Sequence, residues 1–435
     1  MMINAREFPK RRKELMRMMG RETIAILPTA KEKVRNRDAE YPFRADSDFY
    51  YLTGFPEPEA LMVLLPGREK GEFILFCRER DAEKETWHGR RAGIEGACEI
   101  YGADDAFPIE DLGDILPGLI ESCDRVFYTF GNDSESDQKI TGMVHTLRAQ
   151  ARSGKHTPHE FVALEHLLHD MRLYKSRSEL KVMREAAHIS AAAHVKAMQA
   201  CKPGVMEYQL EAEFLYAFRR ANGHPAYSTI VGGGDNGCIL HYTENGSVLV
   251  DGDLVLIDAG AEIDNYAADI TRTFPVNGRF SEAQRALYQV VLDAQYAAIE
   301  QVQPGNHWND PHQATVKVLT EGLLALGLLK GTLAELIEEQ AYRRFYMHRT
   351  GHWLGLDVHD VGDYKVGDEW RVLEPGMVLT IEPGLYIGAE KDIPKRFRNM
   401  GIRIEDDVVV TKEGHEVMTD GVPKEIAAIE QLMAG

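Results

Sequence analysis

One short phrase occurs twice in this chain. Each copy closes with an acid, one further residue and a glycine. The first copy, GDLVLIDAG, has Asp258 as its acid, and the second, GMVLTIEPG, has Glu382 in the matching place. A further acid follows each copy, Asp269 after the first and Glu405 after the second. A chain that repeats itself in this way is expected to fold into two related halves. Because each half then presents two carboxylates, a metal site is the first hypothesis.

Length and composition limit the class of protein. A chain of 435 residues exceeds one ordinary core and predicts two domains. Hydrophobic residues at 44% and charged residues at 27% are typical of a soluble globular protein. A net charge of −19 argues against nucleic acid as a partner, because binding phosphates requires a basic face.

Other classes are disfavoured by what the chain lacks. Its longest apolar runs, such as residues 61–65, are too short to span a bilayer, and its basic N-terminus has no signal-peptide pattern. Five scattered cysteines without a CxxC pair indicate neither a disulfide framework nor a thiolate zinc site. We therefore expect a cytoplasmic protein without a membrane partner.

A domain boundary is predicted near residues 171–178. The preceding part, residues 1–172, mixes helices with short buried strands and is expected to form an α/β domain. Its predicted strands cover residues 23–27, 61–65, 73–76 and 126–128. In the second part, residues 173–435, Ser176 and Glu179 form a capping-box pattern at the start of a long helix.

The repeat predicts paired strands, then helices, then paired strands again. In the first copy, residues 254–258 and 268–274 are expected to pair around a turn centred near Ile263 and Asp264. In the second copy, the expected strands are residues 377–382 and 402–410. This order indicates an α+β domain with internal pseudo-twofold symmetry, with a site between its sheet halves.

The hairpin is expected to bring Asp258 and Asp269 opposite or nearly opposite each other, with Cβ atoms roughly 4.5–5.5 Å apart. Two bare carboxylates that close repel each other, and a divalent cation would favour both ionised forms. The motif HRTGHWLGLDVHD adds three histidines within a short glycine-containing segment, His348, His352 and His359.

Charge counting favours two ions. Four carboxylates balance two divalent ions, and one histidine completes a mostly oxygen ligand set that suits manganese, cobalt, zinc or iron. Two such ions about 3.5–4 Å apart can share a bridging hydroxide and polarise a carbonyl. The predicted chemistry is hydrolysis without a protein nucleophile.

Several segments resemble one known family. GCILHYTEN, VLIDAGAEIDNYAADITRTFPVNG, GHWLGLDVHD, GMVLTIEPGLY and GIRIEDDVVVT are similar to the metallopeptidase family of pita-bread fold, which contains methionine aminopeptidase, prolidase, aminopeptidase P and creatinase. The two-domain layout and the stretch EYPFRADSDFYYLTGFPEPEA look most like its bacterial Xaa-Pro aminopeptidase (aminopeptidase P) branch. The resemblance covers nearly the whole chain. It implies a pita-bread catalytic domain preceded by a smaller α/β domain of the aminopeptidase P N-terminal type.

The resemblance implies roles for individual residues. The ligands of a dinuclear site, usually of manganese with cobalt or zinc also possible, would be Asp258, Asp269, His352, Glu382 and Glu405, with Asp269 and Glu405 bridging the ions. Further site residues would be His241, His348, His359 and Arg403, of which His241 and His359 contact the substrate. Two positions of the N-terminal domain, Asp38 and Trp87, would lie near the cleft, Trp87 reaching a neighbouring subunit's site.

One departure concerns the first histidine of the motif. The family often has glycine after it, whereas Arg349 and Thr350 follow His348 here. The ligand set does not change, but the placement of His348 and the rim of the pocket are affected.

The implied activity is that of a metal-dependent exopeptidase. It would release the N-terminal residue from peptides with proline in second position, through a hydroxide bridging two divalent ions. The alternative is prolidase, which shares the five ligands but cleaves Xaa-Pro dipeptides. A more remote alternative is a peptidase-like binding module without activity, although such proteins lose ligands and this chain retains all five.

Self-association is also expected, as a dimer or a tetramer. The N-terminal half contains more aromatic side chains than a small domain readily buries, and aromatic residues are enriched at interfaces between proteins. The family resemblance also implies a homo-oligomer. The aromatic residues are Phe43, Phe49, Tyr50, Tyr51, Phe55 and Trp87.

Overall fold

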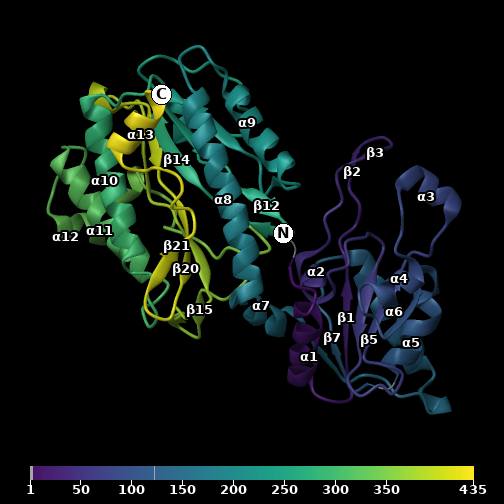
Figure 1. Cartoon of the computed structure of the whole chain (residues 1–435). Helices are drawn as coiled ribbons and strands as arrows, with labels where there is room; N and C mark the ends of the chain where they lie inside the picture. Colours follow the sequence, from purple (N-terminus) through teal and green to yellow (C-terminus); the bar gives the residue numbers. More distant parts are fainter. Residues whose placement is uncertain (1–2, 122) are drawn as a thin grey trace. The chain divides into compact units, whose positions relative to one another are not determined.

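The chain forms two compact units in a computed structural model that describes residues 3–121 and 123–435. One unit is Asn4–Met171, and the other is Arg172–Gly435 together with Ile3. Figure 1 shows the first unit in purple and blue and the second in teal, green and yellow. Across the described residues, no helix combines the length and the apolar character needed to cross a membrane.

The N-terminal unit is built on a six-stranded sheet. Its central strand, β1, is antiparallel to β4 and parallel to β7. All four strands predicted for this part of the chain are present. The order across the sheet is β6 (Asp105–Pro108), β5 (Phe73–Cys77), β4 (Leu61–Leu64), β1 (Thr23–Pro28), β7 (Arg125–Phe127) and β8 (Glu160–Val162).

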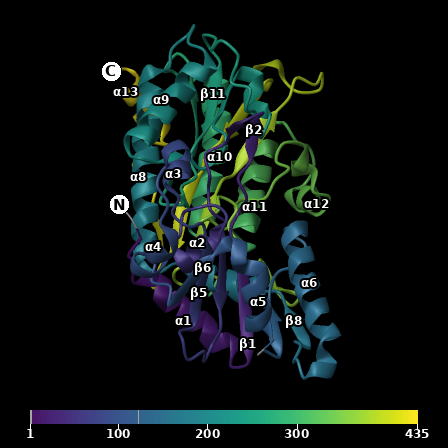
Figure 2. The same ribbon diagram turned by 90° about the vertical axis from the view of Figure 1, so that its right-hand side faces the viewer.

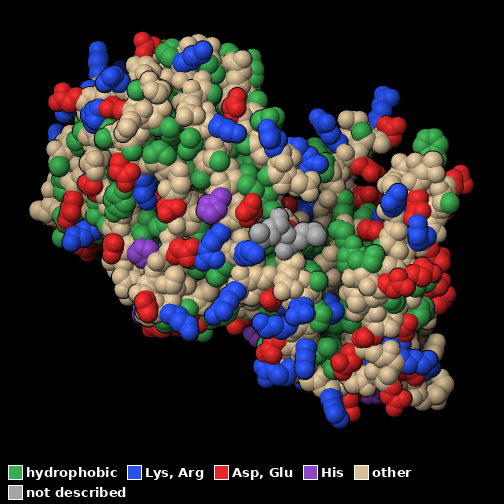
Figure 3. Space-filling view, in the orientation of Figure 1, with side chains coloured by type: hydrophobic (Ala, Val, Ile, Leu, Met, Phe, Trp, Pro, Cys, Tyr) green, Lys and Arg blue, Asp and Glu red, His purple; other side chains and the backbone are tan. Residues whose placement is uncertain are grey.

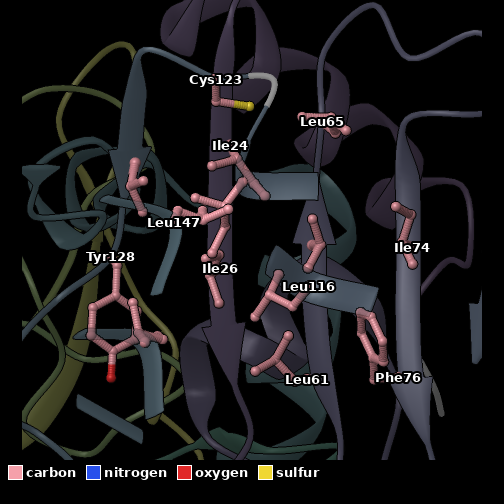
Figure 4. Close-up of a cluster of buried hydrophobic side chains, with 14 residues drawn as sticks. Ile24, Ile26, Leu61, Leu65, Ile74, Phe76, Leu116, Cys123, Tyr128 and Leu147 are labelled. Carbon is pink, nitrogen blue, oxygen red and sulfur yellow. The ribbon is translucent and has the colours of Figure 1, made fainter. Parts of the chain in front are cut away.

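Helices cover both faces of this sheet. Helices α5 (Leu112–Ile120) and α6 (Ser134–Ala149) pack on one face, where Ile24 and Ile26 of β1 belong to a buried cluster with Leu116. Figure 4 shows this cluster, in which alternate residues of each strand point toward the same side. Successive side chains of a strand point to opposite faces of the sheet, so helices on both faces bury all the side chains of a central strand.

The opposite face is covered by α1 (Glu7–Met19) and α2 (Ser47–Thr53), which contact each other. The Arg12 guanidinium of α1 lies over the Phe73 ring of β5, 3.9 Å from its centroid. In Figure 1, α1 and the pair α5 and α6 lie on opposite sides of the strands, and Figure 2 gives the same unit from another side. This unit is therefore a layered α/β structure.

Most of the aromatic side chains that predicted self-association are buried in the core of this unit. Tyr50 and Tyr51 are buried, Phe49 and Phe55 are completely buried, and Trp87 is 79% exposed. The expectation that this unit cannot bury them was wrong for these four, because α2 buries Phe49, Tyr50 and Tyr51, and Phe55 is buried just after it. They therefore give no argument for self-association.

Two pairs of antiparallel helices organise the C-terminal unit. Helix α8 (Arg177–Ala200) contacts α9 (Glu207–Arg220), and α10 (Glu282–Ile299) contacts α11 (Asp310–Ala325). The predicted capping box is present at the start of α8. The Ser176 hydroxyl accepts from the Glu179 amide, and the Glu179 carboxylate accepts from the Ser176 amide.

A three-stranded antiparallel sheet accompanies each helix pair, which confirms the predicted α+β fold with an internal repeat (Figure 1). Each copy of the repeated phrase forms one strand, β11 in the first sheet and β17 in the second. The first sheet is β10 (Ile230–Gly233), β11 (Leu254–Asp258) and β14 (Thr271–Pro275), and the second is β17 (Val378–Ile381), β20 (Asp406–Val410) and β21 (His415–Val417).

Smaller sheets complete the unit and correct two predicted details. The turn lies at Asp264 and Asn265, both with positive φ as a type I′ hairpin turn requires, one residue beyond the predicted centre. It joins β12 (Ala261–Ile263) to β13 (Tyr266–Ala267), where we expected only a turn. The polar pair Asp-Asn is the local cause of this placement.

The second correction concerns residues 402–410, which do not form one strand. They divide into β19 (Met400–Arg403), which pairs with β18 (Gly384–Ile387), and β20, which pairs with β17. The chain changes partner at Ile404 and Glu405, so these two residues belong to neither ladder. This change of partner leaves Glu405 free for another role.

The backbone of Ala268 lies so close to Gly260, just after β11, that a side chain at Gly260 has no room. A Cβ atom added there would lie 1.6 Å from the backbone oxygen of Ala268. We expect Gly260→Ala to lower the free energy of unfolding by about 1–3 kcal/mol or more, because this backbone must move. The matched change Gly246→Ala, where the nearest atom is 3.8 Å away, should cost far less. Equal unfolding midpoints for the two variants in urea would contradict this account.

Candidate metal centre

The strand ends of the two sheets bring the four predicted carboxylates together. Asp258 is the last residue of β11 and pairs with Thr271, so Asp269 lies two residues beyond the directly opposed position. Its side chain is still on the same side, because alternate residues share a face. In the second sheet, Ile381 pairs with Asp406. Glu382 and Glu405, one residue further on each chain, therefore come to the same end.

The segment that contains His352 reaches these four carboxylates by pairing with β17. Trp353 forms an isolated bridge with Leu379, and the His352 amide donates to the Thr380 hydroxyl at 3.1 Å. A Cβ atom at Gly351 would lie 1.9 Å from the backbone oxygen of Thr380, so only glycine allows the two segments to lie this close. Because β17 leads directly into Glu382, the pairing also brings His352 beside that carboxylate.

These side chains surround one cavity of about 250 Å³. Nine of the predicted site residues line it, and all nine belong to the C-terminal unit. The structure therefore brings together His241, Asp258, Asp269, His348, His352, His359, Glu382, Arg403 and Glu405.

The ligand atoms in this cavity suit a divalent ion. Single ligand atoms of Asp269, His352 and Glu405 all lie within 4.8 Å of one another. His352 uses Nδ1 to contact the Trp353 backbone oxygen at 2.9 Å, which leaves Nε2 available. That nitrogen lies 3.4 Å from Asp269 and 3.8 Å from Glu382. A histidine that donates one nitrogen to a carbonyl and presents the other is the usual arrangement of a metal ligand.

The charges in the cavity give a second test of fit. Burial, together with neighbouring carboxylates, raises the pKa of Asp269 and raises that of Glu405 well above its ordinary value. Burial also raises the pKa of Glu382 to about 7. Although burial opposes the charged form of His352, its contact with Asp269 and the charge of Glu382 raise the pKa of this imidazole to about 9. The raised pKa values of the carboxyl groups show that the protein alone disfavours their ionised forms, and a bound cation would favour them.

Arg403 compensates part of the negative charge of these carboxylates. Its guanidinium forms a buried ion pair with Asp258 and donates to the Tyr386 hydroxyl at 3.0 Å and to the Thr271 hydroxyl at 3.0 Å. The Thr271 hydroxyl lies 2.6 Å from Glu405 and donates to it. One arginine thus holds two of the four acids, Asp258 directly and Glu405 through Thr271.

The three other histidines do not have the ligand environment of His352. His348 contacts the Arg349 backbone oxygen through Nδ1 and the Tyr386 hydroxyl through Nε2, so both ring nitrogens are occupied. Burial and the nearby Arg403 charge lower the pKa of His348 to about 4. His359 packs edge to face on His352, with ring centroids 4.4 Å apart, and burial lowers its pKa. His241 is an exposed residue at the cavity wall.

Four residues of this centre were not anticipated. The Tyr227 hydroxyl lies 2.5 Å from both Asp258 and Asp269, and nothing in the nearby sequence marks this tyrosine. The Asp407 carboxylate accepts from the Asp269 amide at 3.2 and 3.1 Å. Thr271 could have been found from its spacing, since it shares a strand face with Asp269. The fourth residue is Tyr386, which joins His348 to Arg403.

The two predicted positions outside the C-terminal unit are both exposed. Asp38 lies in the turn between β2 (Val34–Asn36) and β3 (Ala39–Glu40), and Trp87 lies on α3 (Ala82–His88). Both residues belong to the N-terminal unit, and their approach to the cavity stays a prediction.

Comparison with known proteins supports the interpretation of this cavity. The sequence model described as metallopeptidase family M24 matches residues 181–412, and the model for the aminopeptidase P N-terminal domain matches residues 8–128. The Xaa-Pro aminopeptidase of Escherichia coli strain K12 is 45% identical over 433 residues, which cover 99% of this chain and 98% of that protein.

Solved structures are similar over the whole chain. The Pseudomonas aeruginosa aminopeptidase PepP is 59% identical, with a TM-score of 0.99 over 100% of this chain and 98% of that one. The zinc-substituted E. coli aminopeptidase P in complex with product is 44% identical, with a TM-score of 0.97 over 100% and 99% of the two chains.

Protonation of Glu382 predicts how the stability of the metal-stripped protein depends on pH. Its pKa is about 7 in the folded state against an ordinary 4.5, so the folded chain retains a proton that the unfolded chain loses. The stability gained is full below pH 4.5 and is lost as the pH rises through 7. At one pKa unit per 1.36 kcal/mol, the loss is roughly 3 kcal/mol.

This loss can be measured with chelator-treated protein in urea between pH 5 and 8. We expect Glu382→Gln to remove a downward slope of stability with pH that the unaltered protein shows. Glu413→Gln, at an exposed position, should retain it. Identical slopes for the unaltered protein and Glu382→Gln would mean that Glu382 is already ionised when the protein lacks metal.

Proposed function

Because this chain belongs to metallopeptidase family M24, we infer that it is a Xaa-Pro aminopeptidase, a metal-dependent exopeptidase that releases the N-terminal residue from peptides with proline second. The observation that carries the inference is the buried cavity in which four carboxylates and His352 converge. The match extends through both units of the chain, and its curated and solved relatives named above are aminopeptidases. This agreement favours the aminopeptidase over the dipeptidase and over a binding module without activity.

We propose that five residues hold two divalent ions, with Asp269 and Glu405 shared between them. Four carboxylates balance the charge of two such ions, and a mostly oxygen ligand set suits manganese first and cobalt or zinc as alternatives. Ions bound there would supply Lewis acidity toward the substrate carbonyl and lower the pKa of a water molecule toward neutrality. The five ligands are Asp258, Asp269, His352, Glu382 and Glu405.

The remaining histidines are proposed to act on the substrate. His241 and His359 line the cavity without belonging to the ligand cluster, and a neutral imidazole retains one N–H that can donate to a carbonyl oxygen. Their proposed role is to stabilise the negative charge that develops on that oxygen. His348 is proposed to act from the wall of the cavity, where Tyr386 holds it, and Arg403 is proposed to fix the ionised acids.

Specificity for proline follows from the chemistry of the bond. A peptide bond before proline has no N–H, so a peptidase that binds this hydrogen cannot hold the substrate well. A centre that holds the carbonyl oxygen and the free amine does not need it. We propose that Asp38 and Trp87 contact the substrate from the N-terminal domain, residues 1–172, and that residues 173–435 form the catalytic domain.

The location, partners and oligomeric state of the enzyme are also proposed. A net charge of −19 disfavours nucleic acid, and Lys and Arg on the face shown in Figure 3 are interspersed with Asp and Glu. We propose a cytoplasmic protein that acts on peptides without a membrane partner. A homodimer or homotetramer is supported by Trp87, whose 79% exposure leaves a large aromatic surface for an interface.

Peptide substrates test the proposed activity directly. The metal-loaded protein should cleave a tripeptide with proline second faster than a Xaa-Pro dipeptide. Replacing proline by alanine should remove most of the rate, and acetylating the N-terminus should block cleavage, because the amine can then no longer bind. Product formation followed by chromatography gives the rates, with chelator-treated protein as the control. Equal rates for the proline and alanine peptides would refute the specificity, and a faster dipeptide would favour prolidase.

Single substitutions separate substrate-binding residues from metal ligands. We expect His241→Ala and His359→Ala to lower kcat about 100-fold or more, the effect of removing one donor to a developing oxyanion, while metal content stays unchanged. Asp269→Asn should lose metal and activity together. His307→Ala, an exposed histidine outside the cavity, should alter neither. Metal loss in the His359 variant, measured by elemental analysis after dialysis, would make that residue a ligand.

A further inference from the structure

The N-terminal unit contains a second group of side chains with the composition of a metal site. One ligand atom each from Asp124, His156 and His159 lies within 4.8 Å of the other two. All three residues are exposed, unlike the centre in the C-terminal unit. The aminopeptidase P N-terminal match ends at residue 128 and the M24 match begins at residue 181, so both histidines fall between the two matched regions.

The sheet itself determines where two of these residues lie. Asp124 precedes β7 and His159 precedes β8, and these parallel strands begin in register, with Arg125 beside Glu160. The Asp124 backbone oxygen accepts from the His159 amide at 2.8 Å, and its amide donates to the Glu22 oxygen at 2.8 Å. The Asp124 backbone is thus held from both sides. Figure 4 shows the preceding residue, Cys123, at this end of the buried cluster.

The third residue comes from the loop that leads into β8. His156 contacts the Asp124 carboxylate through Nε2 at 2.7 Å, and its ring stands edge to face on His159 with centroids 5.5 Å apart. In a tetrahedral zinc site with bonds near 2.0–2.1 Å, ligand atoms are separated by roughly 3.3 Å. The exposed side chains therefore need only small rotations to surround an ion.

The neighbouring charges do not oppose a cation. Lys155 forms an ion pair with Glu121, and Arg125 forms one with Glu160 at 2.5 Å. Both basic side chains next to the group are thus neutralised by partners of their own. The Asp124 carboxylate, 56% exposed, remains open to a hydrated ion from solvent.

We propose that Asp124, His156 and His159 form a second metal site, separate from the catalytic centre, for an ion of the zinc class. Two imidazoles and one carboxylate select zinc, cobalt, nickel or copper over magnesium and calcium, which require oxygen ligands. Three protein ligands leave one position for water, as in open zinc sites. The bound ion clamps the segment 151–159 onto the start of β7, because His156 and Asp124 come from those two places.

Counting ions tests the site. Untagged protein loaded with manganese at the catalytic centre is dialysed against zinc, and bound zinc is measured by elemental analysis. The unaltered protein should retain one more zinc ion per chain than the double variant His156→Ala/His159→Ala. Exchange of zinc at the catalytic centre is the same in both proteins and cancels. The control His145→Ala, an exposed histidine of α6 outside the group, should retain the additional ion.

Trypsin tests the clamp, since Arg152 and Lys155 lie in the clamped segment. At zinc ten times above its dissociation constant, cleavage after these residues should slow about tenfold in the unaltered protein. It should not slow in the double variant at the same zinc concentration, which also controls for any effect on trypsin. Equal zinc content in the unaltered protein and the double variant would overturn the proposed site. The contact between His156 and Asp124 would then be only a surface hydrogen bond. Additional zinc without protection from trypsin would overturn the clamp.

Discussion

Mutual repulsion of four carboxylates in one buried cavity is the constraint on which the C-terminal unit depends. Three of the four acids, Asp258, Asp269 and Glu405, have hydrogen-bonding partners close by. Arg403 and Tyr227 contact Asp258, Thr271 contacts Glu405, and Asp407 accepts from the Asp269 backbone. Because these partners come from both sheets, the acids could not be assembled by either half alone. These contacts fix the acids in place, and Arg403 compensates only part of their charge, so a bound cation would compensate the remainder.

The repeated phrase made the architecture predictable. Nearly continuous apolar runs before Asp258 and Glu382 indicate buried strands, and a strand that ends in an acid places that acid at the end of its sheet. The spacing of the second acid in each half then indicates a paired segment. Residue patterns of this kind act within a few positions of the chain, which is why the four acids and the long capped helix α8 were predictable from the sequence.

Contacts between distant segments were not predictable in the same way. Tyr227 lies 31 residues from Asp258, in a loop whose sequence carries no periodicity. The change of partner at Glu405 was hidden because residues 402–410 have strand-like composition on both sides of it, and composition does not tell whether one strand or two strands are formed. The burial of Tyr50 and Tyr51 depends on how α2 packs, which composition does not reveal.

The division of the proposed ligands between two halves of the chain has a consequence for the order of folding events. Asp258 ends β11 of the first sheet and Asp269 precedes β14, whereas His352, Glu382 and Glu405 lie beside the strands of the second sheet. During synthesis the first half emerges with two of the proposed ligands and cannot yet form the full set. Strong ion binding must wait until the second half has docked, so the ion is captured late and stabilises the native state more than its early intermediates. Loss of the ion would then chiefly accelerate unfolding, with a smaller effect on the rate of refolding.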